Sequence, residues 1–285
     1  MYDLRLRLSS IIIFIPKNTM KKIALLTGWP GIERNIALKS VELFKKYCKR
    51  EYDLYIFPEE LNDFLEKRAD YEKVIPVFHG EYGEDGRIQA FLDVLGVSYA
   101  GMNYFINALC MNKMQASKIV ASFGVSVPQE YILPVWKNLS LDELSFWFPM
   151  IVKLNTGGSS YFTYKIETTQ DLEQKINYIH EHIEDDILIQ EYILWEEYSI
   201  SLVKWEVLDA IMFVEKNNPE DFFDYDSKYE SETGMRETFP HLQAELKNTL
   251  MSFAETIKDI FGLTDGYARI DVIVRDGVPY FLEVN

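Results

Sequence analysis

The last residues of the chain, "ARIDVIVRDGVPYFLEVN", place acid and amide side chains at a spacing of two. Arg269 and Asp271 fall on one face of a predicted strand, and Glu283 and Asn285 on one face of the next, because strand side chains alternate. An Asp-Gly turn between the strands would bring both pairs to one end of the sheet. Such oxygen ligands suit a hard cation such as Mg²⁺, which completes its shell with water and phosphates. The alternative is an ordinary hairpin with solvated polar positions.

The stretch "KLNTGGSSYF" is a second candidate. Lys153 ends a predicted strand, and the turn from Gly157 to Ser160 offers backbone N–H groups and hydroxyls to phosphate oxygens. The lysine precedes the glycines and no Gly-Lys-Ser/Thr follows, so the stretch is not a Walker A loop. Taken alone, such a turn is more often a plain surface loop.

A third candidate is "FHGEYGEDG", where His79 ends a predicted strand directly before Gly80. Two glycine turns, the acids Glu84 and Asp85 and a helix start follow, and a helix N-terminus favours anions. Capping of the helix by the two acids explains part of this pattern. It does not explain His79.

Composition limits the kinds of partner. The chain has 285 residues, 48% of them hydrophobic, so it can bury a sizeable core as one large domain or two to three small ones. A net charge of -16 argues against a nucleic acid or an anionic membrane as a partner. Small anionic ligands stay open where local cations gather. The two cysteines, Cys48 and Cys110, are too few for a disulfide framework and indicate a reducing compartment.

Residues 1–19 resemble a poor signal peptide, with arginines before the short apolar run Ile11–Ile15. Pro16, Lys17 and Asn18 offer no small-residue cleavage site. We interpret this segment as a non-structural extension, with the natural start at Met20. No other apolar run approaches the ~20 residues of a membrane span, so the sequence predicts a cytoplasmic protein.

The elements that must position these residues are predicted from periodicity. From Lys21 onward strands alternate with amphipathic helices, which predicts a parallel α/β sheet. The expected strands are "KKIALLTG", "YDLYIF" and "KVIPVF", and a helix begins after the glycine loop with Ile88, Phe91, Leu92 and Leu95 on one face.

Past Gly101 the pattern changes. We expect a helix at 112–123 and short strands at 129–133 and 150–153. A second helix is expected with Leu172, Ile176, Ile179 and Ile183 on its apolar face, and a third from Leu242 to Ile260. "DILIQEYI", "EYSISLVKW" and "EVLDAIMFV" are expected as strands with hairpin connections, ahead of the closing strand pair. Residues 217–240 lack a pattern, and a loop of that length is usually functional or disordered.

Six stretches together resemble the D-alanine:D-alanine ligases of the ATP-grasp superfamily, in order and in approximate spacing. They are "HGEYGEDGRIQAFLDVLGVSYAG", "MNKMQASK", "FPMIVKLNTGGSSY", "LIQEYILWEEYSI", "FDYDSKY" and "ARID...FLEVN", and the similarity runs from Met20 to the last residue. The resemblance implies an α/β fold with an N-terminal doubly wound, Rossmann-like domain at 20–110. A two-part ATP-grasp α+β region follows, with a central subdomain at 111–190 and an apparently truncated C-terminal subdomain at 191–285.

The resemblance also implies roles for individual residues. Glu33 would receive the amino group of the first D-alanine, with His79 beside it. ATP contacts are implied for Lys113, Lys153, Ser160, Gln190, Glu191, Ile193, Glu197 and Lys228, and catalytic roles for Glu33, Ser159, Tyr229 and Arg269. Asp271, Glu283 and Asn285 would hold two Mg²⁺ ions, with Mn²⁺ as an alternative.

Several positions depart from the family pattern. Gly31 stands where the family has a small polar residue, Asn112 where it has Asp, Leu154 where it has Pro and Phe162 where it has Gly. By register, Gln190 takes the position of the adenine-side acid, although Glu191 is one residue away. The family also continues beyond Glu-Val-Asn with a segment that binds the second D-alanine. We therefore expect the chain as written to bind Mg-ATP with reduced affinity and to make little dipeptide.

The implied reaction joins two D-alanines through an acyl phosphate, at the expense of ATP, for peptidoglycan precursor synthesis. Its substrates are small molecules, and a homodimer is left open. The alternatives are a D-alanine:D-lactate ligase, another carboxylate-amine ATP-grasp ligase, or an inactive nucleotide-binding paralogue. Tyr229 goes with an amine acceptor in the resembled family, which favours D-alanine over D-lactate.

Overall fold

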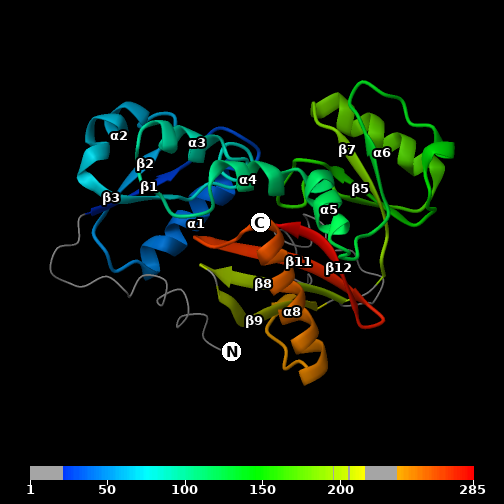
Figure 1. Cartoon of the computed structure of the whole chain (residues 1–285). Coiled ribbons are helices and arrows are strands. Elements are labelled where there is room, and N and C mark those ends of the chain that lie inside the picture. Colours follow the sequence, from blue (N-terminus) through cyan, green and yellow to red (C-terminus); the bar gives the residue numbers. More distant parts are fainter. Residues whose placement is uncertain (1–21, 195, 205, 216–235) are drawn as a thin grey trace. The chain divides into compact units, whose positions relative to one another are not determined.

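The structure is a computed structural model that describes residues 22–194, 196–204, 206–215 and 236–285. It divides into two compact units, Met1–Ala108 and Leu109–Asn285, and the elements of each are labelled in Figure 1. The expected extension at 1–19, the start at Met20, and the residues Lys228 and Tyr229 lie outside the described residues.

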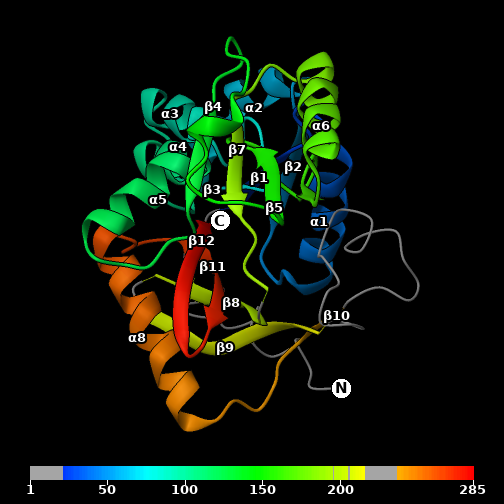
Figure 2. The ribbon, with the colours of Figure 1, turned by 90° about the vertical axis from the view of Figure 1, so that its right-hand side faces the viewer.

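The first unit is built on a parallel sheet of three strands in the order β2-β1-β3. Its elements are β1 (Lys22–Thr27), α1 (Arg34–Tyr47), β2 (Tyr52–Ile56), α2 (Leu61–Lys67), the 3-10 turn η2 (Arg68–Asp70), β3 (Tyr71–Pro76) and α3 (Arg87–Val94). Five of the six β1 residues are buried, as expected for a central strand covered on both faces. Figure 1 and Figure 2 show α1 and α3 on opposite faces of this sheet.

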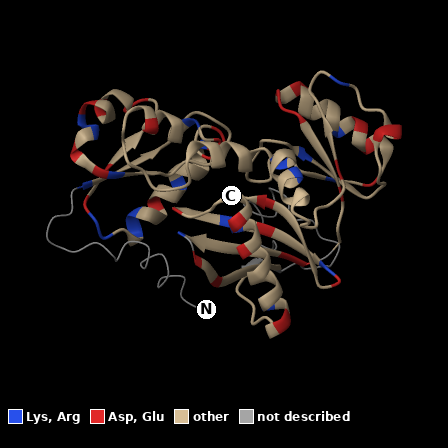
Figure 3. Ribbon diagram, viewed as in Figure 1, with Lys and Arg blue, Asp and Glu red and all other residues tan. Residues whose placement is uncertain are grey.

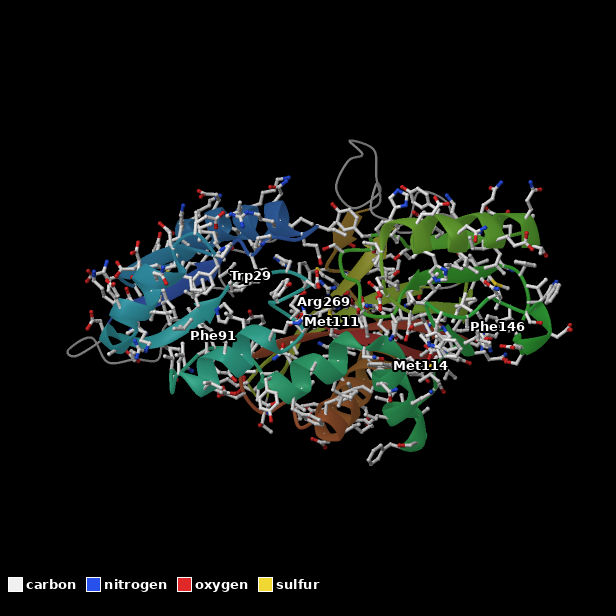
Figure 4. The ribbon with its side chains drawn as sticks, turned by 90° about the horizontal axis from the view of Figure 1, so that it is seen from above. Trp29, Phe91, Met111, Met114, Phe146 and Arg269 are labelled. Carbon is white, nitrogen blue, oxygen red and sulfur yellow. The ribbon has the colours of Figure 1, made fainter. Side chains whose placement is uncertain are left out.

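Aromatic side chains fill much of the core of the first unit. Phe57 and Phe64 are fully buried, and their rings lie 5.7 Å apart. Trp29, labelled in Figure 4, follows β1 and places its ring 4.8 Å from that of Tyr82 in the glycine loop. The loop after β1 and the loop before α3 are therefore held together at one end of the sheet.

Helix α4 (Tyr104–Met111) crosses the point where the chain divides into units, and the second unit then contains two antiparallel sheets. The four-stranded sheet has the order β4-β7-β5-β6. Its elements are α5 (Lys113–Ser122), β4 (Glu130–Leu133), the 3-10 turn η3 (Leu141–Glu143), β5 (Met150–Leu154), β6 (Tyr164–Ile166), α6 (Thr169–His182) and β7 (Ile187–Glu191).

One face of the four-stranded sheet packs on α6, as Figure 2 shows. Its core includes Val152, Ile176, Ile189 and Phe146, the last of which is labelled in Figure 4. Because side chains alternate along a strand, the neighbouring residues of β4, β5 and β7 lie on the other face. That second face carries the polar side chains considered below.

The five-stranded sheet has the order β10-β9-β8-β11-β12, and α8 packs against it. Its elements are β8 (Glu196–Val203), β9 (Glu206–Glu215), β10 (Arg236–Thr238), α8 (Ala244–Phe261), β11 (Tyr267–Arg275) and β12 (Val278–Val284). Asp276 and Gly277 both have positive φ, 53° and 77°, so they form the tight turn expected between the last two strands. Helix α5 packs against β12.

Some expectations about the elements were wrong. β7 and β8 are not joined by a hairpin, since they belong to different sheets. Ile183 caps α6 and Leu242 precedes α8, so neither is helical. Strand β10 lies within the stretch 217–240 that showed no pattern, and α4 and β6 were not predicted.

The charges of the described residues are mixed. Lys and Arg residues are interspersed with Asp and Glu residues along the elements of both units in Figure 3. No helix in the described part of the chain is both long and apolar enough to span a bilayer.

Candidate active site

Asp271 is the centre of a hydrogen-bonded cluster on β11 and β12. Its carboxylate is buried and accepts two bonds from Arg269, from Nε to Oδ1 and from Nη2 to Oδ2, each of 2.8 Å. Ser199 Oγ donates to Oδ1 at 2.6 Å, and Asn285 Nδ2 donates to Oδ2 at 2.8 Å. The two pairs predicted from strand periodicity therefore do converge. Arg269 is labelled in Figure 4.

The backbone pairing explains this convergence. Asp271 lies opposite Glu283 on β12 and opposite Ser199 on β8, and Arg269 exchanges both backbone hydrogen bonds with Asn285, at 2.7 and 2.8 Å. Asn285 Nδ2 also lies 3.5 Å from Glu283 Oε1. Two carboxylates and one amide are thus gathered at the end of the strand pair, with the amide nitrogen of Asn285 toward the carboxylates.

These three side chains form an oxygen-only donor set, which is the chemistry that Mg²⁺ prefers. Among the described residues no three His, Cys, Asp or Glu side chains gather to hold a metal. The set has two acids and an amide, so a metal here would take most of its shell from water or from a ligand. The residues fit such an ion once Asp271 releases part of its present bonding and Asn285 turns its amide oxygen toward the metal.

Lys113 connects this cluster with the loop after β5. Its side chain is buried, its Nζ lies 3.3 Å from Glu283 Oε2, and it donates to the carbonyl of Gly157 at 2.5 Å. Asn112 caps α5 by accepting from the Gln115 N–H at 3.0 Å. Asn serves this purpose as well as Asp, so the departure at Asn112 leaves the helix start intact.

Lys153 lies at the end of β5, among charged groups from four other elements. Burial lowers the pKa of its ammonium, and the charge of Lys113 acts in the same direction. The carboxylates of Glu283, Glu130 and Glu197 oppose this shift. A bound anion stabilises two neighbouring lysines in a partly buried site, because its charge offsets both the desolvation of their ammonium groups and their mutual repulsion.

The loop between β5 and β6 holds Ser159 and Ser160 in the left-handed backbone region, with φ of 49° and 57°. Phe162 is left-handed as well, with φ of 53°, at the position where the family pattern has glycine. Its ring lies 6.0 Å from that of Tyr178 on α6. The loop thus keeps the left-handed backbone conformation that glycine adopts most readily. The aromatic contact packs the loop against α6.

Gly157 allows this loop to turn tightly against the strand it follows. A Cβ at Gly157 would lie 2.7 Å from Leu154 Cβ and 2.8 Å from Leu154 Cδ1, too close for any real contact. Gly157→Ala should therefore displace the carbonyl that Lys113 contacts. We expect the affinity for a phosphate ligand such as ATP to fall by about tenfold, the cost of one misplaced charged hydrogen bond.

Gly31→Ala is the matched control, because nothing lies within 4 Å of a Cβ built there. Equilibrium binding of ATP to the two variants is the measurement. Equal affinities would show that the tight turn at Gly157 does not position the Lys113 contact.

The expected adenine and ribose contacts lie on β7 and β8. Gln190 is buried and donates from Nε2 to Glu130 Oε1 at 2.6 Å. Glu191 accepts from Gln129 Nε2 at 3.1 Å and pairs with Arg275 at 3.7 Å. Ile193 is buried in the segment that leads to β8, and Glu197 on β8 acts electrostatically on Lys153.

A separate cluster forms in the first unit around Gly80. Glu33 is buried at the start of α1, where it is the N-cap residue but makes no side-chain cap hydrogen bond. Its Oε2 would lie 1.7 Å from a Cβ at Gly80, which shows how closely the carboxylate packs on that backbone. His79 Nε2 lies 2.8 Å from Ser40 Oγ, and Glu84 accepts from the Gly80 N–H at 2.8 Å.

Sequence reasoning missed three residues that organise these sites. Asn155 is buried and accepts from the backbone N–H groups of Lys113, through its carbonyl, and of Met114, through Oδ1. Ser199 stands two residues after Glu197 on the same strand face, a signal that periodicity could have shown. Glu130 is the third, and no local pattern marks it.

A surface hollow at the start of α6 is separate from these groups. It is lined by Lys165, Glu167, Thr168, Gln170, Asp171 and Gln174, none of which is a candidate site residue.

Comparisons with known proteins agree with this arrangement. The family described as "D-ala D-ala ligase C-terminus" matches residues 134–285. The D-alanine–D-alanine ligase A of Bacillus cereus is 32% identical over 264 residues, covering 90% of this chain and 85% of that protein. A crystal structure of D-alanine–D-alanine ligase from Bacillus anthracis has a TM-score of 0.80 at 30% identity, covering 94% of this chain and 86% of that one.

A second Bacillus anthracis structure of the same enzyme, complexed with ATP, has a TM-score of 0.77 at 27% identity. It covers 93% of this chain and 86% of that one. The likeness in both sequence and structure extends over both compact units.

Proposed function

The chain belongs to the D-alanine–D-alanine ligase family, and we propose that the residues gathered around Lys113 are the ATP and metal site of that reaction. This protein is an ATP-dependent ligase that joins two D-alanine molecules, a step of peptidoglycan precursor synthesis. The mixed α/β fold agrees with the fold of the solved family members. The alternative of an inactive nucleotide-binding paralogue is left to the experiment below.

One observation carries the assignment of the site. Lys113 contacts the Gly157 carbonyl of the serine loop and the Glu283 carboxylate of the oxygen cluster at the same time. A single buried cation thereby joins a loop suited to phosphate oxygens to a donor set suited to Mg²⁺. An ATP phosphate chain bridging the two would satisfy Lys113 and Lys153 together.

The chemistry follows from what such residues can do. A carboxylate is a poor acyl donor at neutral pH, so the carboxylate of the first D-alanine attacks the γ-phosphate of ATP, which gives an acyl phosphate and releases ADP. The amine of the second D-alanine then displaces phosphate. Negative charge develops on oxygen in both steps, and preorganised cations such as Arg269 stabilise it. Mg²⁺ held by Asp271, Glu283 and Asn285 would supply further charge stabilisation.

We assign the remaining residues by the same reasoning. Glu33 and His79 would bind the first D-alanine, since the Glu33 carboxylate packs on Gly80 and His79 directly precedes that glycine. Ser159 and Ser160 would contact phosphate, and Gln190, Glu191, Ile193 and Glu197 would bind the nucleoside. Lys228 and Tyr229 would close the site in this proposal, with Tyr229 favouring D-alanine over D-lactate as the acceptor.

The finer organisation of the fold is part of the same proposal. The parallel sheet with α1 and α3 on opposite faces would be the doubly wound N-terminal domain. The four-stranded and five-stranded sheets would be the central and C-terminal ATP-grasp subdomains, which meet between residues 190 and 191. D-alanine and ATP would be the partners of the protein in the cytoplasm.

Phosphate release from ATP is the direct test of the function. We expect release that requires both ATP and D-alanine, and D-alanyl-D-alanine as the product when the segment that the family carries beyond Glu-Val-Asn is appended. Release from ATP alone would contradict a ligase. ATP binding without any D-alanine-dependent release would favour the nucleotide-binding paralogue.

The lowered pKa of Lys153 leads to a pH prediction. The ammonium form binds phosphate, and its pKa in the free protein lies below the ordinary 10.5. ATP affinity should therefore be highest below that lowered pKa and fall as pH rises through it. The fall should be centred below the ordinary 10.5 of a lysine ammonium.

Lys153→Arg is the control for this pH profile, because a guanidinium stays charged over the whole range. Its ATP affinity, measured by calorimetry, should be nearly constant with pH. A profile equally steep in the variant would assign the titration to another group.

A further inference from the structure

Gln190 occupies the position where the family pattern has an acid, and the structure shows what accompanies this change. Its side chain amide donates from Nε2 to Glu130 Oε1 at 2.6 Å. The two residues lie directly opposite each other on β7 and β4. Gln190 is 3% exposed, so its amide is held within the sheet layer and not in bulk solvent.

The pair shares a face of the sheet with Lys153. Gln190 is paired with Ile151, and Lys153 with Leu188, so all four side chains fall on the same side by strand alternation. Glu130 lies on that side too, and it interacts electrostatically with Lys153. The opposite side is the apolar core against α6. Gln190 and Glu130 therefore belong to the polar face that the proposed nucleotide site uses.

The hydrogen bond between Gln190 and Glu130 determines which end of the Gln190 amide is available to a ligand. An ionised carboxylate can only accept hydrogen bonds, so it must meet the NH₂ end of the amide. The oxygen end, Oε1, is then left over. Within the described part of the chain no donor is bonded to Oε1, and that atom is not fully buried. It is an acceptor that still needs a partner.

We propose that Glu130 sets the base selectivity of the nucleotide site, by holding Gln190 so that Oε1 accepts the 6-amino group of adenine. This inference rests on the proposed function, which places the base beside Gln190. A 6-oxo purine would present a second acceptor to Oε1, and two facing acceptors cannot bond. With the amide reversed, Nε2 would instead favour the 6-oxo base, so the orientation imposed by Glu130 is the selecting feature.

The test compares ATP with inosine triphosphate, which carries the 6-oxo group and the same sugar and phosphates. We expect ATP to bind about tenfold more tightly to the full chain, the cost of leaving an acceptor without a donor once the bound base covers it. Binding is measured by competition at about pH 8. Burial raises the pKa of the Glu130 carboxyl, and mildly alkaline solution favours its ionised form.

Glu130→Gln should bring the two affinities to within about twofold of each other, because an amide at position 130 can meet either end of Gln190. Combining Glu130→Gln with Gln190→Glu should restore the preference for ATP, since the new carboxylate at position 190 only accepts. Glu167→Gln removes an exposed acid and serves as the control, with an unchanged ratio.

The outcomes separate this inference from the proposed function. ATP binding with the same ATP preference in Glu130→Gln would overturn the role of Glu130 and leave the nucleotide site standing. Failure of the double variant to recover the preference would overturn it too. If the unaltered chain binds neither nucleotide, the proposed site is wrong and the inference falls with it.

Discussion

Asp271→Asn is expected to lower D-alanine-dependent phosphate release by at least about 100-fold, the scale of loss when catalytic groups are misplaced. The carboxylate now accepts four hydrogen bonds, from Arg269, Ser199 and Asn285. An amide of the same shape has one oxygen, so its NH₂ group must face donors. Arg269 and Asn285 would lose their shared acceptor and move.

The same substitution should raise the Mg²⁺ concentration that ATP binding requires, because one anionic ligand is removed. The free energy of unfolding should fall by about 1 to 3 kcal/mol, the cost of buried donors without an acceptor. Release kinetics, a Mg²⁺ titration of ATP binding and denaturant unfolding measure the three effects.

Asp276→Asn provides the matched control on the same strand pair. Asp276 is in the turn with φ of 53°, a conformation that asparagine adopts readily. We expect wild-type release and stability for this variant. If Asp271→Asn behaved in the same way, the oxygen cluster would have no part in the reaction.

Gly80→Ala is expected to weaken D-alanine binding by about tenfold or more, because the Glu33 carboxylate must leave its position. A Cβ there would lie 1.7 Å from Glu33 Oε2 and 2.7 Å from Glu33 Cδ. Gly80 also has φ of +63°, which costs an alanine about 1 to 2 kcal/mol of stability. ATP binding should be preserved, because the residues proposed to bind ATP belong to the second unit.

Gly96→Ala isolates the two effects, since Gly96 has φ of +65° but open space around its Cβ position. Both variants should lose similar stability, and only Gly80→Ala should lose D-alanine affinity. Calorimetric titration with D-alanine and thermal unfolding distinguish them. An equal loss of affinity in both would mean that backbone strain, and not Glu33, is responsible.

Local patterns in the sequence were sufficient to predict the structural features that depend only on residues close together in the chain. Alternation placed Arg269 with Asp271 and Glu283 with Asn285, and the Asp-Gly pair specified a turn that needs two left-handed residues. The helices whose apolar face was recognised in the sequence were also predicted, apart from residues at their ends. These features are local because one strand or one helix suffices to define a face.

The choice of strand partners depended on the whole molecule. "DILIQEYI" and "EYSISLVKW" follow each other in the chain, yet β7 pairs with β4 and β5 while β8 pairs with β9 and β11. Either arrangement satisfies the alternation of each strand. Only the burial of two separate apolar faces, one on α6 and one on α8, decides between them.

The sequence by itself determined the family, the residue types of the site and the strand pair that carries the oxygen ligands. The tertiary structure alone decided that Lys113 joins Gly157 to Glu283, that Asp271 is shared by three donor residues, and that Glu130 orients Gln190 across 60 positions of chain. Periodicity records which side of an element is buried. It does not record which polar group meets another inside, because buried donors and acceptors must be paired within the folded chain and their partners come from any part of it.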